Sequence, residues 1–274
     1  MSEIFYVVTT QPTEQLAAFC DELARNLDVV IVSDQEPSIK SCRALTIWVP
    51  DEEVRKVGFV NSNPYKTKTP TAWDKALYLT SKAKRDFFWF CEDDVVFSSP
   101  RDALSLVRSY SGDKSDLLCQ QFFSYRRLPN WANWCYRANF SDDVLMGGFF
   151  PVCRVSSSLA NVISDFVQKY GTLSFIETML PSCARANNLT ISALPELKWL
   201  AFRASPPLTL SEIVVLSKSG FAKVFHPVKD ISIRAAFEEY ASEGLFKHLS
   251  VGSVILLQRQ ISILKRRARE LRNR

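Results

Sequence analysis

The sequence predicts an α/β fold with a mixed, mainly parallel central sheet flanked by helices, followed by a C-terminal helical tail. Three observations favour this class. The first fifty residues alternate strand-like and helix-like patterns, residues 87–90 are apolar at every position, and the last segment carries apolar residues at helical spacing. The chain has 274 residues, of which 47% are hydrophobic and 23% charged. Such a chain can bury a large core, which excludes disorder as a description of the whole.

The opening segment predicts a strand, a helix and two more strands. Residues 4–9 are β-branched or aromatic almost throughout, which is typical of a central strand buried on both faces. Thr13 can cap a helix, and residues 29–32 and 44–49 form two further apolar runs. The helix between the first two strands presents Leu16, Phe19, Leu23 and Leu27 at helical spacing. The pattern is typical of a parallel, nucleotide-binding α/β sheet.

The middle of the chain predicts the centre of that sheet. A polar, proline-bounded loop over residues 61–70 precedes a helix over residues 72–79. Residues 86–91 form the next strand, and its fully apolar run belongs in the middle of the sheet. Residues 117–123 indicate another strand, followed by an aromatic-rich loop over residues 125–140.

The remaining elements are less regular. A glycine pair opens residues 146–152, helices are expected over 156–170 and 175–184, and a late strand over 191–194. No regular element is predicted between residue 206 and the tail. In the tail the apolar residues alternate spacings of three and four, which is a heptad pattern; they are Val254, Leu257, Ile261, Leu264, Ala268 and Leu271.

Charge and cysteine content limit the classes of partner and the compartment. The net charge is +5, but the last ten residues hold six Lys or Arg against one Glu, so the body is close to neutral and nucleic acid is not an expected partner. The seven cysteines are odd in number, scattered and mostly embedded in apolar runs, which predicts reduced thiols. No secretory signal or membrane span is recognisable, so a cytoplasmic location is expected.

The acidic triplet Glu92, Asp93 and Asp94 directly follows the strand over residues 86–91. Carboxylates at the carboxyl end of a central strand face the crevice where α/β sheets bind ligands. Adjacent acids repel one another unless a cation neutralises them, and oxygen ligands favour Mn²⁺ or Mg²⁺. Alternation along an extended chain puts Glu92 and Asp94 on one side, so these two are expected to bind the metal. The alternative is that the acids cap the following helix or lie in a solvated loop.

Residues 89–97 resemble the DXD region of GT-A glycosyltransferases, a Rossmann-like fold family. The resemblance extends loosely over residues 4–230, and it is nearest to small glycosyltransferases of algae and their large DNA viruses. It implies that Glu92 and Asp94 bind Mn²⁺ or Mg²⁺, which holds the diphosphate of a nucleotide-sugar, with Asp93 nearer the ribose or sugar. The segment with Lys75 resembles the helix that lines the family's nucleotide pocket. The implied catalytic domain covers residues 1–232, with a nucleotide-binding half over 1–97, an acceptor-binding half over 98–232 and a tail over 233–274.

The same resemblance implies roles for two residues far along the chain. His226 stands where the family often takes a further metal ligand, and Lys229 where a lysine can pair with the diphosphate; a structural histidine is the alternative. Glu177 stands where inverting members carry the base that deprotonates the acceptor hydroxyl. From the residues alone, apolar neighbours would raise the pKa of Glu177 toward the range of proton transfer, whereas a helix-terminal acid is the plain alternative. Asp142 and Asp143 are its rivals.

The remaining candidates are strand-end and loop residues. Asp34 ends the second strand and can bond the uracil or ribose, or simply form a turn. Thr9 and Thr10 end the first strand and have the same two interpretations, a contact with the nucleoside or a local structural role. Trp131 and Trp134 could stack on the pyranose ring of an acceptor sugar, and core packing is the alternative. Gly147 and Gly148 would allow the backbone to approach the sugar closely, and a simple bend is the alternative.

The sequence therefore predicts a metal-dependent, inverting glycosyltransferase that moves a sugar from a UDP-sugar to a glycan or glycoprotein hydroxyl. UDP is preferred only because it is frequent in the family. Two other classes stay open: a metal-dependent nucleotidyl or phosphoryl transferase, which would need a glycine-rich phosphate loop that the sequence lacks, and a silent sugar-binding module. The tail is expected to pack on the catalytic domain, form a dimer seam or touch an anionic membrane surface.

Overall fold

The computed structural model describes residues 2–61, 69–124, 140–194, 200–202, 208–218, 223–230 and 232–233. The chain forms two compact units. The first unit contains residues 1–95 and 100–198, and the second contains residues 96–99 and 199–274. The predicted boundary at residue 232 and the division at residue 97 stay predictions.

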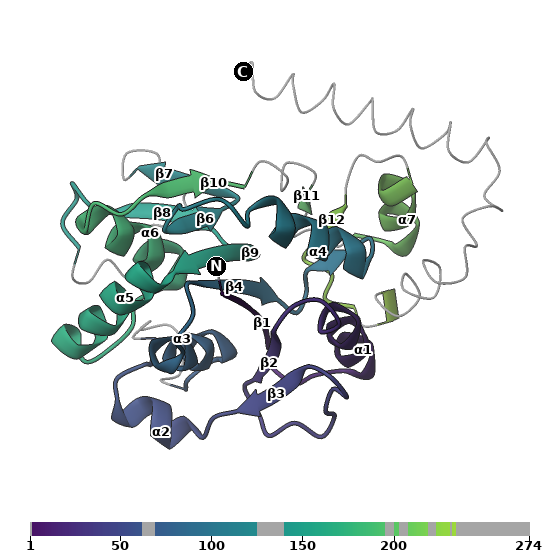
Figure 1. Ribbon diagram of the computed structural model, residues 1–274, viewed down its shortest axis with the longest axis horizontal. Helices are drawn as coiled ribbons and strands as arrows, with labels where there is room; N and C mark the ends of the chain where they lie inside the picture. The colour runs from purple at the N-terminus through teal and green to yellow at the C-terminus, as the bar shows by residue number, and fades with distance from the viewer. Residues whose placement is uncertain are drawn as a thin grey trace, which may run out of the picture. The chain divides into compact units, whose positions relative to one another are not determined.

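A seven-stranded sheet in the order β10-β6-β9-β4-β1-β2-β3 forms the first unit's framework (Figure 1). Every neighbouring pair is parallel except the two pairs made by β9, which runs antiparallel to both β4 and β6. The strands are β1 (Glu3–Thr9), β2 (Val29–Ser33), β3 (Leu45–Trp48), β4 (Phe87–Glu92), β6 (Leu117–Cys119), β9 (Val152–Ser156) and β10 (Ile191–Ala193). The predicted α/β class with a mixed, mainly parallel sheet is confirmed.

Helices cover both sides of this sheet. They are α1 (Glu14–Leu23), α2 (Asp51–Lys56), α3 (Ala72–Lys82), α4 (Pro100–Ser109), α5 (Ser157–Tyr170) and α6 (Ile176–Ala186). Buried residues of α3, α5 and α6 join Tyr6, Val8, Phe88 and Phe90 in one hydrophobic cluster. α1 packs against α4 and β2, and Figure 1 shows this pair on the other side of the sheet from α3.

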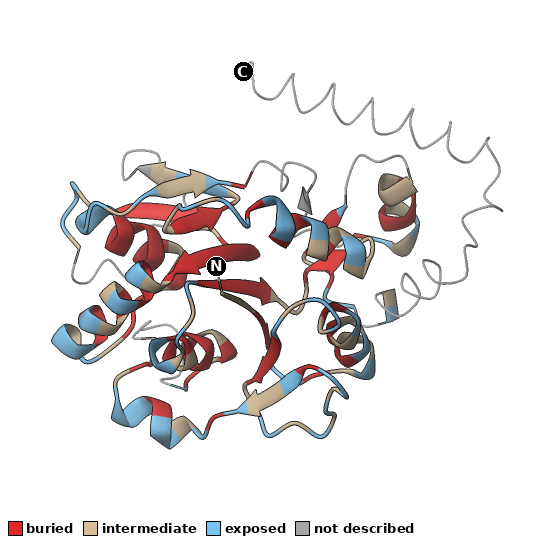
Figure 2. Cartoon of the chain, viewed as in Figure 1, coloured by how far each residue is buried: buried red, intermediate tan, exposed pale blue. Residues whose placement is uncertain are grey.

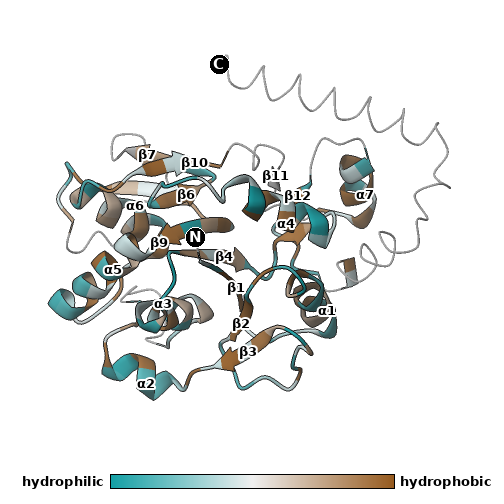
Figure 3. Cartoon of the chain, viewed as in Figure 1, coloured by the Kyte–Doolittle hydropathy of each residue, from teal (hydrophilic) through white to brown (hydrophobic). Residues whose placement is uncertain are grey.

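The central position of β1 and β4 follows from their sequences. A strand covered on both faces needs apolar side chains at consecutive positions. β4 is buried at its first five residues and β1 at its last five, and both lie in the red interior of Figure 2 and carry the brown of apolar residues in Figure 3. At the sheet edge, β3 is exposed or half-buried throughout.

The predicted single strand over residues 117–123 is two strands. β6 ends at Cys119, and β7 (Gln121–Ser124) pairs antiparallel with β8 (Met146–Phe149) in a separate two-stranded sheet. The apolar run continues through this break, so hydrophobicity alone could not locate it. Gln120 separates the two strands, and its amide donates to the Phe149 carbonyl at 3.3 Å.

The second unit contains a three-stranded sheet in the order β11-β12-β5. β11 (Leu200–Phe202) is parallel to β12 (Val224–His226), and β12 is antiparallel to β5 (Val96–Phe97). Phe225 of β12, with Val214 of α7 (Leu210–Lys218), belongs to a small hydrophobic cluster.

The sequence analysis named no regular element for several parts of the structure: α2, β5, β8, β9, β11, α7 and β12. α2 and β5 have only six and two residues, too few for a periodic pattern to show. The predicted tail, with its heptad and basic end, lies outside the described residues. Among the residues that are described, no helix has both the length and the apolar character needed to cross a membrane.

Candidate functional site

The carboxyl ends of parallel strands β1, β2 and β4 meet at one edge of the main sheet. The register pairs Thr9 with Ser33 and Val8 with Glu92, so the three strands end almost level. Ligands of open α/β sheets bind outside this edge. The acidic triplet therefore lies where the sequence placed it, at the end of a central strand.

A tight turn, rather than an extended chain, presents the acids. β4 ends at Glu92, and the Val95 amide donates to the Glu92 carbonyl at 3.1 Å, which closes a turn with Asp93 and Asp94 at its centre. The strand alternation invoked for these acids therefore does not apply beyond Glu92. A carboxylate oxygen of Glu92 nevertheless lies within 4.8 Å of one of Asp94.

Asp93 is directed at the first strand. Its amide donates to the Val8 carbonyl at 3.1 Å, and its carboxylate accepts the Thr9 hydroxyl at 2.6 Å. Thr9 is 2% exposed and donates also to the Gln11 carbonyl at 3.0 Å. Thr9 and Asp93 therefore tie the acidic turn to the end of β1.

Trp73 orients the Glu92 carboxylate. The indole Nε1 donates to Glu92 Oε1 at 3.1 Å, and the ring stacks on Phe90 with centroids 5.2 Å apart. A rigid, stacked donor fixes a carboxylate oxygen at low entropic cost, as the outer-shell partners of metal ligands do.

A cavity of about 540 Å³ opens at this edge of the sheet. Five carboxylates line it, and among its described lining residues none is basic. The acids are Asp34, Asp51, Asp74, Glu92 and Glu177, with Thr10, Gln35, Asn61, Thr69, Pro70, Thr71, Trp73, Phe175 and Ile176 as the other lining residues. Like charges gathered in one partly enclosed space favour a bound cation.

Two of these acids have strongly raised pKa values. Burial raises the pKa of Asp34 to about 6, although the Lys75 ammonium and the Ala72 amide lower it. Burial also raises the pKa of Asp74 to about 6, against hydrogen bonds from Thr71. The Asp74 carboxylate accepts the Thr71 amide at 2.8 Å in a capping box that begins α3. Both acids therefore titrate near neutral pH.

Lys75 lies behind the cavity rather than in its lining. Its side chain is fully buried, and Nζ pairs with Asp51 Oδ1 at 2.9 Å and donates to the Asp34 carbonyl. Three elements are thereby linked: α3, the amino terminus of α2 and the end of β2. Its location fits a positioning role, and its predicted contact with a nucleotide stays a prediction.

Glu177 reaches the cavity from a different part of the chain. It lies in the first turn of α6, after Phe175, whose carbonyl accepts the Thr178 and Met179 amides at 3.0 and 2.7 Å. Phe175 and Ile176 line the same cavity, so the amino end of α6 faces it. The cavity thus collects Glu92 and Glu177, which are far apart in sequence, together with Thr10 and Asp34.

None of the other predicted residues that the structure describes lines this cavity. Gly147 and Gly148 are buried in β8, where a Cβ on Gly148 would lie 2.4 Å from Phe150 Cζ. His226 is buried at the end of β12 and Lys229 is exposed, both in the second unit. Trp131 and Trp134 lie outside the described residues.

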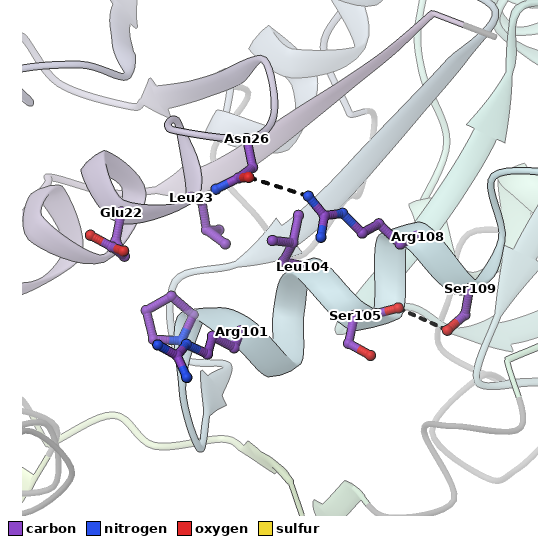
Figure 4. A pocket seen from close by; sticks show the side chains of 9 residues that line it. Glu22, Leu23, Asn26, Arg101, Leu104, Ser105, Arg108 and Ser109 are labelled. Carbon is purple, nitrogen blue, oxygen red and sulfur yellow. Dashed lines mark hydrogen bonds between the residues drawn. The ribbon is translucent and has the colours of Figure 1, made fainter.

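A second hollow, of about 610 Å³, lies between α1 and α4 (Figure 4). Arg108 lines it and donates to Asn26 Oδ1 at 3.2 Å across the two helices, as the figure shows. Glu22 and Arg101 line it too, so its charge is mixed. None of the sequence-predicted site residues lines this hollow.

Sequence reasoning assigned no site role to two acids of this cavity, Asp51 and Asp74, or to Trp73, the hydrogen-bond partner of Glu92. Asp51 opens the unpredicted α2, so nothing marked it. Asp74 follows Thr71 by three residues, a spacing that indicates a helix start and gives no sign of a ligand pocket. Trp73 lies among apolar residues in the sequence of its helix, and its hydrogen bond to Glu92 depends on its stacking on Phe90 of β4.

No known family model and no curated protein matches this sequence. Solved structures do resemble the fold at low identity. A galactosyltransferase, LgtC, in complex with donor and acceptor sugar analogues has a TM-score of 0.44 at 12% identity, over 88% of this chain and 95% of that one. A 2-C-methyl-D-erythritol 4-phosphate cytidylyltransferase from Thermus thermophilus has 0.39 at 10%, over 70% and 87%. Glucosyl-3-phosphoglycerate synthase from Mycobacterium tuberculosis, in complex with Mn²⁺, UDP-glucose and phosphoglyceric acid, has 0.38 at 12%, over 79% and 76%.

Proposed function

We propose that this protein is a metal-dependent glycosyltransferase of the GT-A type, which moves a sugar from a UDP-sugar to a hydroxyl of a glycan or glycoprotein. One observation carries the proposal. A single cavity at the carboxyl edge of the sheet is lined by the end of the acidic strand, by Asp34 after β2 and by Glu177 from α6. These are the groups expected to serve the metal, the nucleoside and the acceptor.

The donor set fits a hard divalent cation. Glu92 and Asp94 offer carboxylate oxygens within 4.8 Å of one another, and Mg²⁺ and Mn²⁺ prefer oxygen ligands. We propose His226 as a third ligand. β12 pairs with β5 through Phe225 and Val96, and Val96 follows Asp94 by two residues along the chain. Lys229 is proposed as a partner of the diphosphate.

A bound cation would neutralise the charge of the departing diphosphate, and side chains of the protein would orient the donor and activate the acceptor. An anionic donor is repelled by the cavity's acids until a cation is present, so the cation and the donor should bind together. Trp73 holds the Glu92 carboxylate, and Asp34 and Thr10 offer oxygens to the nucleoside. Asp93, tied to Thr9, is proposed to face the ribose or sugar.

The acceptor side is assigned to Glu177. Its carboxylate would accept the proton of the acceptor hydroxyl while that oxygen attacks the anomeric carbon from the side opposite the leaving UDP, which inverts the configuration. The acceptor contacts proposed for Trp131, Trp134, Gly147 and Gly148 remain as predicted from the sequence, and a cytoplasmic location is likewise a proposal.

A nucleotide-sugar panel tests the function. With Mn²⁺ present, we expect a UDP-sugar to raise the melting temperature and to release UDP slowly when no acceptor is present. Release of pyrophosphate from a nucleoside triphosphate and a sugar phosphate would instead identify a nucleotidyltransferase, since such an enzyme could also use the acid-lined cavity. Stabilisation by sugars with no turnover at all would leave a binding module. No response to any nucleotide-sugar contradicts the central proposal.

Glu177→Gln tests the base. We expect turnover to fall by about 10² to 10⁴ while UDP affinity changes by less than about twofold. Glu14→Gln is the matched control, because Glu14 also lies in the first turn of a helix but lines neither cavity. Full activity in Glu177→Gln would remove this assignment and direct attention to Asp142 and Asp143.

A further inference from the structure

The outer edge of the main sheet is apolar and exposed. β3 is its last strand and, among the described residues, pairs only with β2. Leu45 is 58% exposed and Trp48 39%, and these are two of the four large hydrophobic residues that the described part of the chain exposes. Figure 3 shows the strand in brown at the rim of the molecule, where Figure 2 shows tan and pale blue instead of the buried red.

β3 is short, which limits strand pairing, but it carries none of the other usual protections of an edge strand. Native edge strands are commonly blunted by lysine, proline, a bulge or inward-facing charges. The four residues of β3, Leu-Thr-Ile-Trp, include no charge and no proline. Such an apolar edge is a template for another strand, because its outward amides and carbonyls have no partner in their own sheet.

The charges that flank β3 select the partner. Exposed Lys40 and Arg43 precede the strand, and exposed Glu52 and Glu53 follow it in the first turn of α2. An antiparallel copy of the same segment brings the basic end of one strand beside the acidic end of the other. A parallel copy would bring like charges together, and a strand of uniform charge would match only one end.

We propose that β3 is the interface between two copies of this chain, paired antiparallel about a two-fold axis through Ile47. In this register Ile47 lies opposite its own copy, and the basic residues that precede one strand lie beside the acidic start of α2 in the other copy. The two seven-stranded sheets then form one continuous sheet. The inference is independent of the proposed enzymatic activity, because it uses no residue assigned to the metal, donor or acceptor.

A charge placed on the edge tests the interface. We expect the full-length protein to sediment as a concentration-dependent dimer and Leu45→Lys to raise the dimer dissociation constant at least about tenfold, because two lysines would face the partner strand. Phe122→Lys is the control, since Phe122 is also 39% exposed but lies in the two-stranded sheet. Circular dichroism of each variant checks that the fold is retained.

Cysteine cross-linking tests the register. In a Cys42→Ser background, which removes the one described cysteine that is exposed, Ile47→Cys should form a disulfide-linked dimer on mild oxidation, whereas Leu45→Cys should not. Two outcomes overturn the proposal: wild-type protein that stays monomeric at high concentration, and a dimer that Leu45→Lys leaves unchanged. The latter would place the contact elsewhere, for example in the predicted C-terminal seam. A disulfide-linked dimer formed by Thr46→Cys and not by Ile47→Cys would overturn the proposed register.

Discussion

At the scale of single residues, the candidate site is a set of carboxylates with different surroundings. Asp34 and Asp74 are both buried enough to raise their pKa values to about 6, whereas Asp93 is bonded to a hydroxyl and Glu92 to an indole. A buried acid that loses its proton destabilises the folded state unless a cation or a donor compensates. The site's chemistry and the protein's stability are therefore linked.

This link gives a prediction for pH. The folded-state pKa values of Asp34 and Asp74 exceed the unfolded value of 3.8, so the folded protein binds more protons between pH 3.8 and about 6. The free energy of unfolding should therefore fall as pH rises through this window, and then level off. Urea unfolding without divalent cations at a series of pH values measures it. Asp34→Asn should flatten the slope, and an unchanged slope would contradict the assignment of Asp34.

A substitution of Trp73 tests the hydrogen bond to the proposed metal ligand Glu92 without changing any metal ligand. Trp73→Phe keeps the stack on Phe90 and removes the donor to Glu92. We expect the dissociation constant for Mn²⁺ to rise about tenfold, with a loss of roughly 1 kcal/mol in unfolding free energy. Mn²⁺ titration followed by electron paramagnetic resonance measures the affinity. Equal affinity in both proteins would show that the indole does not support a metal ligand.

At the scale of elements, the strand ends hold the site through a few ties. Thr9→Val should destabilise the protein by about 1–2 kcal/mol and weaken Mn²⁺ binding, because it frees the turn that carries Asp94. Thr13→Ala is the matched control. It removes the N-cap of α1, where the hydroxyl accepts the Leu16 amide at 3.1 Å, and should cost about 1 kcal/mol with no change in Mn²⁺ affinity. Parallel losses of affinity would mean that stability alone governs binding.

Gly148 has a packing role that can be separated from the proposed contact with acceptor sugar. An added methyl group would meet Phe150 and lie 3.2 Å from the Gln121 carbonyl oxygen. Gly148→Ala should therefore cost about 1–3 kcal/mol. Gly112→Ala, where no atom lies within 4 Å of the added carbon, should change stability by less than about 0.5 kcal/mol. Thermal unfolding of both variants measures these changes in stability. Equal stability of the two variants would contradict the steric explanation.

Elements also show what the sequence could predict. The FFWF run of β4 and the alternation of strand and helix in the first fifty residues were sufficient for the central sheet, because burial on both faces requires continuous apolar residues. The break at Gln120, the two-residue β5 and the short α2 depend on partners distant in sequence. Asp51 lines the cavity because it begins α2, and Trp73 contacts Glu92 because α3 packs on the sheet. Neither role could be assigned from local sequence patterns.

At the scale of the whole molecule, the proposed cation connects residues from two parts of the sequence. Glu92 ends β4, Asp94 lies in the turn after it, and His226 ends β12. Ligands of one ion contribute jointly, so removing either should remove most of the same binding energy. A cation at about one hundred times its dissociation constant adds about 2.7 kcal/mol to the unfolding free energy, which is visible as a rise in melting temperature.

A double-mutant cycle uses this coupling. We expect Asp94→Asn and His226→Gln each to abolish most of the Mn²⁺-induced rise in melting temperature, and the double variant to lose little more than either single one. Asp142→Asn should retain the full rise, because Asp142 is an exposed acid outside both cavities. Additive losses would mean that the two side chains act on different ions or not at all. A full response in His226→Gln would leave Glu92 and Asp94 as the only assigned ligands, and the metal site would then belong to the acidic turn alone.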